Sequence, residues 1–344
     1  MKKIAIEEHF WSKRYFETLI SNKGFPRLEM KKNENGQEEL AMWNAPDSSF
    51  LLDPGVSSKL LDVGEKRLED MDRVGIDMQV LSLGGPGLEV FEPDAAVTLA
   101  RKANDDLGVI IAAHPERFAG FAAIPTQAPE AAAEELERAV KVLGFRGAKV
   151  SSHIKGTYLD EDQFRVIFET AESLEVPIYL HPRLPPREMI GPYLKYRELA
   201  GPMWGFAADT GLHALRLICS GLFDLFPKLR IILGHLGEAL PFWLTRLDNR
   251  WQWEGAQTGR HTRELKKNPS HYIKKNFLIT TSGMCSQPAL ICSLLAMGAE
   301  SILFAVDYPW ESADESVAFL ESAPISEGDK EKIFYRNAQR YLGL

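Results

Sequence analysis

The sequence has few cysteines, no long apolar run and no dense cluster of basic residues. Three cysteines without metal-binding spacing exclude a disulfide scaffold. No apolar stretch approaches the roughly 18 residues that a membrane span needs. The 40 basic and 48 acidic residues give a net charge of −8, which argues against a nucleic-acid-binding protein. Because the chain starts directly with an apolar, strand-like segment, we expect no signal peptide and a cytoplasmic protein.

Nucleotide-binding motifs are absent too, since no GxGxxG motif follows an expected strand and no GxxxxGK[ST] loop is present. The sequence does contain eight short apolar runs, separated by amphipathic helical stretches. Most of the runs are near-continuous, which is typical of parallel strands covered by helices. This alternation predicts one (β/α)8 TIM-barrel domain over residues 1–344, with a doubly wound open sheet as the alternative. The expected strands are residues 4–10, 78–83, 118–125, 147–153, 176–182, 230–235, 277–283 and 302–309.

Two long segments do not fit the alternation. Residues 21–57 form a polar insertion after the first expected strand, and residues 182–206 form a proline-rich segment after the fifth. Loops of this length are usually either functional or disordered. Both segments contain aromatic residues, which argue against disorder, so we expect walls or lids of a pocket and contacts between subunits. These aromatic residues are Trp43, Phe50, Tyr193, Tyr196, Trp204 and Phe206.

Polar residues with metal-binding or proton-transfer chemistry follow five of the expected strands. In a barrel, the active site lies at the C-terminal ends of the strands. A single histidine in such a place is more often structural, but several on one rim indicate a site. The residues are Glu7, His9, His153, His181, His235 and Asp307.

Four of these residues have the chemistry of a metal centre. Glu7 and His9 are two residues apart and share one face of the first strand, whereas Glu8 points to the other face. Together with His181 and Asp307 they would supply nitrogen and oxygen ligands to an open site. Such mixed ligation suits Mn²⁺, Zn²⁺ or Fe²⁺. The alternative is a salt-bridged Glu7 and a His181 that is hydrogen-bonded in the core.

A histidine and a carboxylate lie close together after the sixth strand. His235 ends the strand and Glu238 is expected at the start of the next helix, so the two can meet and fix the imidazole tautomer. A histidine held in this way is an acid–base or substrate-binding group. Arg246, two helical turns further on, could reach a substrate or a neighbouring subunit, with a surface ion pair as the alternative.

With these residues in view, the chain resembles the metal-dependent aromatic-acid decarboxylase branch of the amidohydrolase superfamily, which includes enzymes of the 5-carboxyvanillate and γ-resorcylate decarboxylase type. The resemblance spans almost the whole chain, and the combination of motifs is specific to this branch. The motifs are AIEEHF (5–10), LLDVGEKRLEDMDRVGID (60–77), LGFRGAKVSSHIKGTYLDE (143–161), YLHPR (179–183), residues 213–248, ITTSG (279–283) and AVDYPWE (305–311).

The resemblance implies one divalent metal ion, with Mn²⁺ expected and Zn²⁺ as the alternative. Its implied ligands are Glu7, His181 and Asp307, and His9 is a ligand or a near-ligand. It also implies that His235, backed by Glu238, is the active-site histidine and that the protein is a homodimer or homotetramer.

The chain departs from the family pattern at two positions. No arginine stands near Leu52, where the carboxyvanillate enzymes hold the substrate carboxylate with one. Trp310 stands where those enzymes have a tyrosine and the resorcylate enzymes usually have phenylalanine. Both departures concern recognition of the substrate acid.

The function predicted by the resemblance is non-oxidative decarboxylation of a hydroxylated aromatic acid, with Asp307 protonating the ring carbon. The alternative is metal-dependent hydrolysis of an amide, an ester or a C–C bond. Glu-x-His on the first strand, in place of the His-x-His of binuclear hydrolases, favours decarboxylation, as does the lack of metal-site partners for Lys149 and Lys155. The expected substrate-binding residues are Phe10, His153, Trp204, Arg246 and Trp310, with Trp11 and Phe206 completing an apolar wall.

Overall fold

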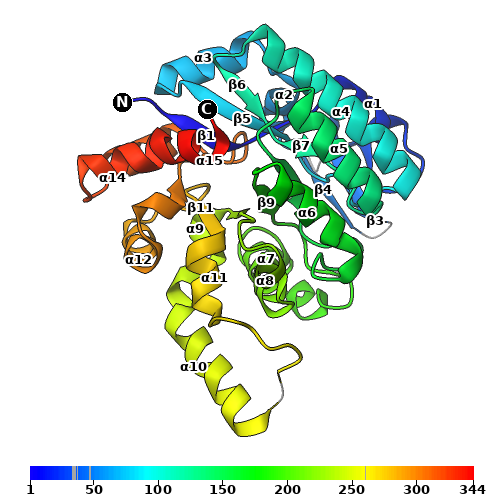
Figure 1. Cartoon of the computed structure of the whole chain (residues 1–344). Helices are drawn as coiled ribbons and strands as arrows, with labels where there is room; N and C mark the ends of the chain where they lie inside the picture. Colours follow the sequence, from blue (N-terminus) through cyan, green and yellow to red (C-terminus); the bar gives the residue numbers. More distant parts are fainter. Residues whose placement is uncertain (33–35, 37, 46–47, 260) are drawn as a thin grey trace.

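Strands form in all eight of the expected apolar runs, and they pair in parallel in the computed structural model (Figure 1). The structure describes residues 1–32, 36, 38–45, 48–259 and 261–344. One sheet has the order β1-β5-β6 and the other the order β12-β11-β10-β9-β8-β7. The strands are β1 (Ile4–Phe10), β5 (Met78–Leu83), β6 (Phe118–Gly120), β7 (Ala122–Ala123), β8 (Ala148–Ser151), β9 (Ile178–His181), β10 (Ile231–Leu233), β11 (Phe277–Thr280) and β12 (Ile302–Leu303).

Hydrogen bonds also join the two sheets. Between β6 and β7, the Phe121 amide donates to the Leu81 carbonyl of β5 over 2.9 Å. On the other side, the Ile6 amide of β1 donates to the carbonyl of Phe304, which directly follows β12, over 3.1 Å. The carboxyl ends of strands from opposite ends of the chain therefore meet at one place.

Helices surround the strands (Figure 1). Several begin with proline, whose fixed φ and missing N–H suit the first helical turn, as in α4 and α5. The helices are α1 (Lys13–Ser21), α2 (Pro54–Leu61), α3 (Glu65–Val74), α4 (Pro93–Ala113), α5 (Pro129–Lys141), α6 (Arg165–Ser173), α7 (Gly205–Cys219), α8 (Leu222–Leu225), α9 (His235–Glu238), α10 (Leu240–Thr258), α11 (Pro269–Asn276), α12 (Gln287–Met297), α13 (Ala313–Glu321), α14 (Glu327–Glu331) and α15 (Asn337–Leu342).

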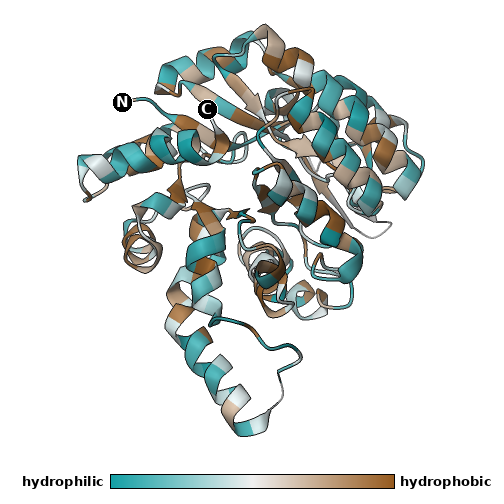
Figure 2. Cartoon of the chain, viewed as in Figure 1, coloured by the Kyte–Doolittle hydropathy of each residue, from teal (hydrophilic) through white to brown (hydrophobic). Residues whose placement is uncertain are grey.

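The strands are buried on both faces, which explains their near-continuous apolar sequences. Ile4 and Ile6 of β1 pack with Val80, Tyr179 and other residues of one apolar cluster, whereas Ala5 belongs to a second and larger cluster. Figure 2 shows the strands coloured mainly as hydrophobic residues, whereas long helices such as α10 carry many hydrophilic ones. None of the helices in the described part of the chain is long and apolar enough to span a membrane.

Residues 21–57 contain a small antiparallel sheet of β2 (Arg27–Lys32), β3 (Glu38–Ala45) and β4 (Ser48–Leu51). Within this expected insertion, residues 33–35, 37 and 46–47 lie outside the described residues. Leu28 and Met42 belong to one apolar cluster with Trp11 and Tyr15, and this cluster attaches the sheet to the segment after β1 and the first turn of α1. The other long segment contains two short helical turns, Gly191–Lys195 and Arg197–Ala200, before α7 begins.

Candidate metal centre

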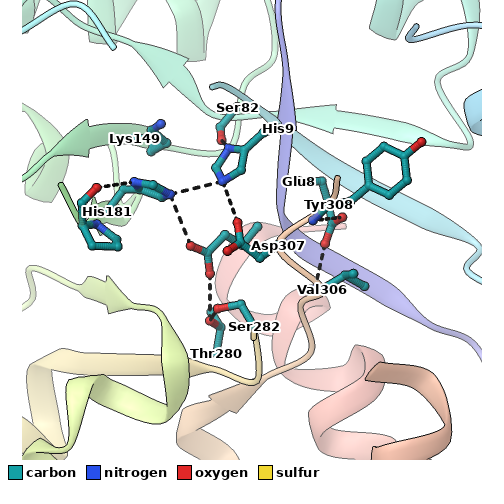
Figure 3. A network of polar contacts seen from close by, with 12 residues as sticks. Glu8, His9, Ser82, Lys149, His181, Thr280, Ser282, Val306, Asp307 and Tyr308 are labelled. Atoms are coloured by element: carbon teal, nitrogen blue, oxygen red, sulfur yellow. Dashed lines mark hydrogen bonds and ion pairs between the residues drawn. The ribbon is translucent and has the colours of Figure 1, made fainter. Parts of the chain in front are cut away.

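The four expected metal ligands lie together where β1, β9 and the segment after β12 meet (Figure 3). Glu7 and His9 come from β1, His181 ends β9, and Asp307 follows β12. One ligand atom from each residue lies within 4.8 Å of all the others. This is the group that the sequence predicted, and it assembles because parallel strands bring their carboxyl ends to the same side.

The ligand atoms face one another at short distances. His9 Nε2 lies 3.0 Å from Asp307 Oδ1 and 3.1 Å from His181 Nε2. His181 Nε2 also lies 3.6 Å from Glu7 Oε1. Within the part of the chain that is described, Glu7 Oε1 and Asp307 Oδ1 are buried and have no hydrogen-bond donor. Two buried carboxylate oxygens without donors are costly, and a divalent cation among them would remove that cost.

The two histidines are held by their other ring nitrogens. His181 Nδ1 lies 2.8 Å from the carbonyl oxygen of Pro182, which can only accept, so Nδ1–H donates and Nε2 keeps its lone pair. Burial lowers the pKa of His181 well below its usual value, which keeps the ring neutral. His9 Nδ1 lies 3.1 Å from Ser82 Oγ. A neutral imidazole with its second nitrogen hydrogen-bonded is the form that binds metals, so these residues fit the expected cation.

The remaining oxygen of Glu7 is anchored in the interior. Glu7 Oε2 accepts hydrogen bonds from the Tyr179 hydroxyl and, over 3.2 Å, from Thr280 Oγ1. Burial raises the pKa of Glu7, and the nearby charge of Asp307 raises it further. A metal ion would offset this repulsion between two carboxylates in one site.

His235 and Glu238 meet as the sequence predicted, but not at the start of a regular helix. Residues 235–239 all have positive φ, and α10 begins only at Leu240. Gly237 suits this turn, because a Cβ there would lie 2.8 Å from Ile279 Cγ2. The turn brings Glu238 Oε1 to 2.7 Å from His235 Nδ1.

The other nitrogen of His235 faces the four expected ligands, which we call the metal cluster, since Nε2 lies 3.8 Å from Asp307 Oδ2. Burial opposes a charge on His235, but Glu238 and Asp307 outweigh it and raise its pKa well above the usual value. Burial likewise raises the pKa of Asp307, but its contacts with His235 and His9 prevail and hold it below the usual value. Glu238 Oε1 and Asp307 Oδ2 thus lie beside the two ring nitrogens of His235, which favours the protonated ring with Nε2–H as a donor.

The sequence did not predict a buried pair of charged residues beside this cluster. Lys149 on β8 lies near His181 and His9 (Figure 3), and its ammonium group donates to the Leu83 carbonyl over 2.6 Å. Burial lowers the pKa of Lys149 to about 8. Glu89 accepts from the Ser151 amide over 2.7 Å, and a small cavity is lined by both charged residues. The sequence feature that could have revealed this pair is a charged residue, Glu89, within the apolar stretch LEVF (88–91).

The expected substrate-binding residues have different positions. Phe10 and Trp11 are 1% exposed and pack in the core, and Trp11 Nε1 donates to the Gly85 carbonyl. His153 is buried, with Nε2 3.0 Å from the Leu184 carbonyl and Nδ1 accepting from the Gly156 amide. The structure therefore places these three in the interior and gives both ring nitrogens of His153 local partners.

Three other expected residues are more accessible. Trp310 is 44% exposed and stands close to the cluster, because its amide donates to the Asp307 carbonyl over 2.8 Å. Trp204 is 53% exposed and directly precedes α7, whose second residue, Phe206, is half-buried. Arg246 lies on α10, where it lines a surface hollow with Phe242. The structure does not bring Arg246 into contact with the four clustered residues.

Residues 54–344 match the protein-family model described as Amidohydrolase. This chain belongs to the amidohydrolase family. The match covers far more than half of the sequence and confirms the resemblance found in the motifs.

Amidohydrolase relatives of the same length carry decarboxylase names. The γ-resorcylate decarboxylase of Polaromonas sp. (strain JS666) is 40% identical over 349 residues, which are 99% of this chain and 98% of the relative. The structure of the dihydroxybenzoic acid decarboxylase of Polaromonas sp. JS666, with bound manganese and the inhibitor 2-nitroresorcinol, is 39% identical. Its TM-score is 0.85, with 100% of this chain and 97% of that chain covered. The 5-carboxyvanillate decarboxylase of Sphingomonas paucimobilis is 34% identical with a TM-score of 0.88, covering 100% and 99% of the two chains.

Proposed function

We propose that this protein catalyses the metal-dependent, non-oxidative decarboxylation of a hydroxylated aromatic acid of the hydroxybenzoate type. The observation that carries the proposal is the convergence of Glu7, His9, His181 and Asp307, with two buried carboxylate oxygens that have no donor in the described part of the chain. Full-length relatives named as decarboxylases, one of them with bound manganese, support both the reaction and Mn²⁺ as the metal. Zn²⁺ is the alternative.

The fold proposed for this activity is a closed (β/α)8 barrel in one domain, residues 1–344, with residues 21–57 as a lid. The hydrogen bonds between the two parallel sheets support closure.

Phe242 on α10 is 73% exposed and lies beside Arg246 and the half-exposed Trp243, which supports a homodimer or homotetramer that covers this face. A cytoplasmic location stays a prediction.

Glu7, His9, His181 and Asp307 would hold the metal ion, which when bound supplies the positive charge that neutralises the substrate's carboxylate and adjacent phenolic oxygen. The protein residues orient the ring and move one proton. His235 Nε2–H donates a hydrogen bond to a ring oxygen, and Glu238 fixes the direction of that donor through Nδ1. Trp310, close to Asp307, would form one wall beside the flat ring.

Asp307 would deliver the proton. The histidine contacts lower its pKa, so Asp307 Oδ2 takes up a proton only when a substrate anion lies beside it. The proton passes to the ring carbon that bears the carboxylate, and this interrupts the aromatic system. The bond to the carboxylate carbon then breaks, CO₂ leaves, and the bond's electron pair restores the aromatic ring. This order avoids a free aryl anion.

The test is turnover of a panel of hydroxybenzoates by the Mn²⁺-loaded protein, followed by loss of ultraviolet absorbance and release of CO₂. In D₂O, we expect one deuterium in the product, at the carbon that lost the carboxylate. The Asp307→Asn variant is the matched control and should incorporate none. Hydrolysis of p-nitrophenyl esters without turnover of any hydroxybenzoate would contradict the proposal and favour the hydrolase alternative.

A further inference from the structure

The backbone at Asp307 has an unusual conformation. Asp307 has a φ of +76°, a value that residues with a side chain rarely adopt. Such a conformation persists only where its surroundings hold it firmly. Its own amide donates to the Glu7 carbonyl over 3.0 Å, but the amides on either side of it, those of Val306 and Tyr308, need separate acceptors.

Glu8 supplies both acceptors. Its Oε1 accepts from the Val306 amide over 2.9 Å and its Oε2 from the Tyr308 amide over 3.3 Å (Figure 3). Glu8 is completely buried and lies on the face of β1 opposite to Glu7 and His9. One side chain of β1 therefore holds the amides of both residues that neighbour Asp307, and the strand neighbours of Glu8, Glu7 and His9, belong to the group of expected metal ligands.

The same carboxylate is tied to a buried cation. Gln79 Nε2 donates to Glu8 Oε2 over 3.4 Å, and Arg67 Nη1 donates to Gln79 Oε1 over 3.3 Å. Arg67 is completely buried, and its Nη2 donates to the His9 carbonyl over 2.6 Å. The residues Glu8, Gln79 and Arg67 thus contact the main chain on both sides of Asp307 and at His9.

We propose that Glu8 is a positioning residue that fixes the Asp307 carboxylate for metal binding and for proton delivery, with Gln79 and Arg67 holding Glu8 in place. The proposal rests on the proposed roles of Asp307. A carboxylate suits this task because its two oxygens accept two N–H groups at once, whereas a glutamine has one acceptor and would present its NH₂ group to the other amide.

The decisive variant is Glu8→Gln, which keeps the size and removes one acceptor. Isothermal titration of the metal-free protein with Mn²⁺ should show affinity lower by roughly 10- to 100-fold, as is usual when a residue that supports metal ligands is changed. With saturating Mn²⁺, kcat on a hydroxybenzoate should fall by a similar factor while KM changes little. If Glu8 only stabilised the fold, the folded fraction of the variant would keep the Mn²⁺ affinity and the kcat of the wild type.

Gln79→Met provides a second test if Glu8→Gln does not fold. It removes the hydrogen bonds to Glu8 and Arg67, leaves both backbone contacts of Glu8, and should weaken Mn²⁺ binding by a smaller factor. Glu135→Gln is the matched control, because Glu135 is also a buried carboxylate, held by Asn104 and Arg138 between α4 and α5. We expect Glu135→Gln to lower the melting temperature without a change in Mn²⁺ affinity.

The outcomes separate this inference from the proposed function. Wild-type Mn²⁺ affinity and kcat in folded Glu8→Gln would overturn the positioning role. An equal loss of Mn²⁺ affinity in Glu135→Gln would also overturn it, because the loss would then follow stability alone. If the wild type turned over no hydroxybenzoate, the proposed function would fail, while the Mn²⁺ titrations would still decide the role of Glu8.

Discussion

Two buried clusters of polar side chains lie at the carboxyl ends of the strands, and they differ in how completely their atoms are paired. The metal cluster leaves Glu7 Oε1 and Asp307 Oδ1 without donors among the described residues. The second cluster, formed by Ser152, Tyr158, Asp209 and His213, has a partner for each of its side-chain polar atoms in the same part of the chain.

The second cluster contains a serine, a histidine and an aspartate in contact, yet it is not built for nucleophilic catalysis. His213 Nε2 accepts from the Leu159 amide over 3.0 Å, so the neutral ring carries its proton on Nδ1, 3.2 Å from Ser152 Oγ. Ser152 in turn donates to Asp209 over 2.7 Å. With this tautomer, His213 cannot take the serine proton. The comparison teaches that residue types alone do not define a site, because hydrogen-bond partners decide what a buried serine, histidine and aspartate can do.

The largest expected difference between the clusters comes from their aspartates. Asp307→Asn should reduce turnover of hydroxybenzoates by more than about a thousandfold, because the amide cannot deliver the ring proton, an effect of general-acid size or larger. Asp209→Asn should instead lower the free energy of unfolding by about 1–3 kcal/mol. The Ser152 and Tyr158 hydroxyls both donate to the Asp209 carboxylate, and in the variant one of them would face an NH₂ group, which cannot accept. Turnover assays and urea denaturation of both variants check this. Near wild-type turnover by Asp307→Asn would refute its role as proton donor.

The histidines should differ in metal content. His181→Ala removes one of the expected ligand nitrogens, so the purified variant should contain little bound metal and lose activity with it. His213→Asn should be less stable but should retain a full complement of metal, because the two ring nitrogens of His213 contact Ser152 and Leu159 and neither of these is an expected ligand. Elemental analysis of both proteins after identical dialysis measures the difference. Equal metal content in the two would mean that His181 is not a ligand.

The smallest expected effect is the pH dependence of stability that comes from His213. Burial lowers the pKa of His213 to about 3, so below about pH 6.5 the unfolded chain binds a proton that the folded protein does not. This contribution to stability is complete above pH 6.5 and is lost as the pH falls. It amounts to about 2 kcal/mol between pH 6.5 and 5. Urea denaturation should show that the free energy of unfolding falls further in the wild type than in His213→Asn between these pH values. Parallel pH profiles of the two proteins would contradict this role of His213.

The strands and the polar residues that cluster near their carboxyl ends could be predicted because each depends on short stretches of sequence. Near-continuous apolar runs predicted all eight strand segments, and the polar residues towards their carboxyl ends predicted the four residues that cluster. The expected helix start at Glu238 was wrong, since residues 235–239 adopt positive φ. A Cβ at residue 237 of that turn would lie 2.8 Å from Ile279 Cγ2 of β11, a distant neighbour that a local pattern does not contain.

The sequence by itself determined where strands form and which kinds of side chain stand at their ends, because apolar periodicity and strand alternation act over a few residues. Only the tertiary structure decided which of these side chains share a site and which are satisfied elsewhere. Glu8 and Val306 are 298 residues apart, and nothing near either one indicates that the carboxylate and the amide meet. The packing of the strands brings the two groups together in space, and it thereby sets which donors and charges surround each buried group.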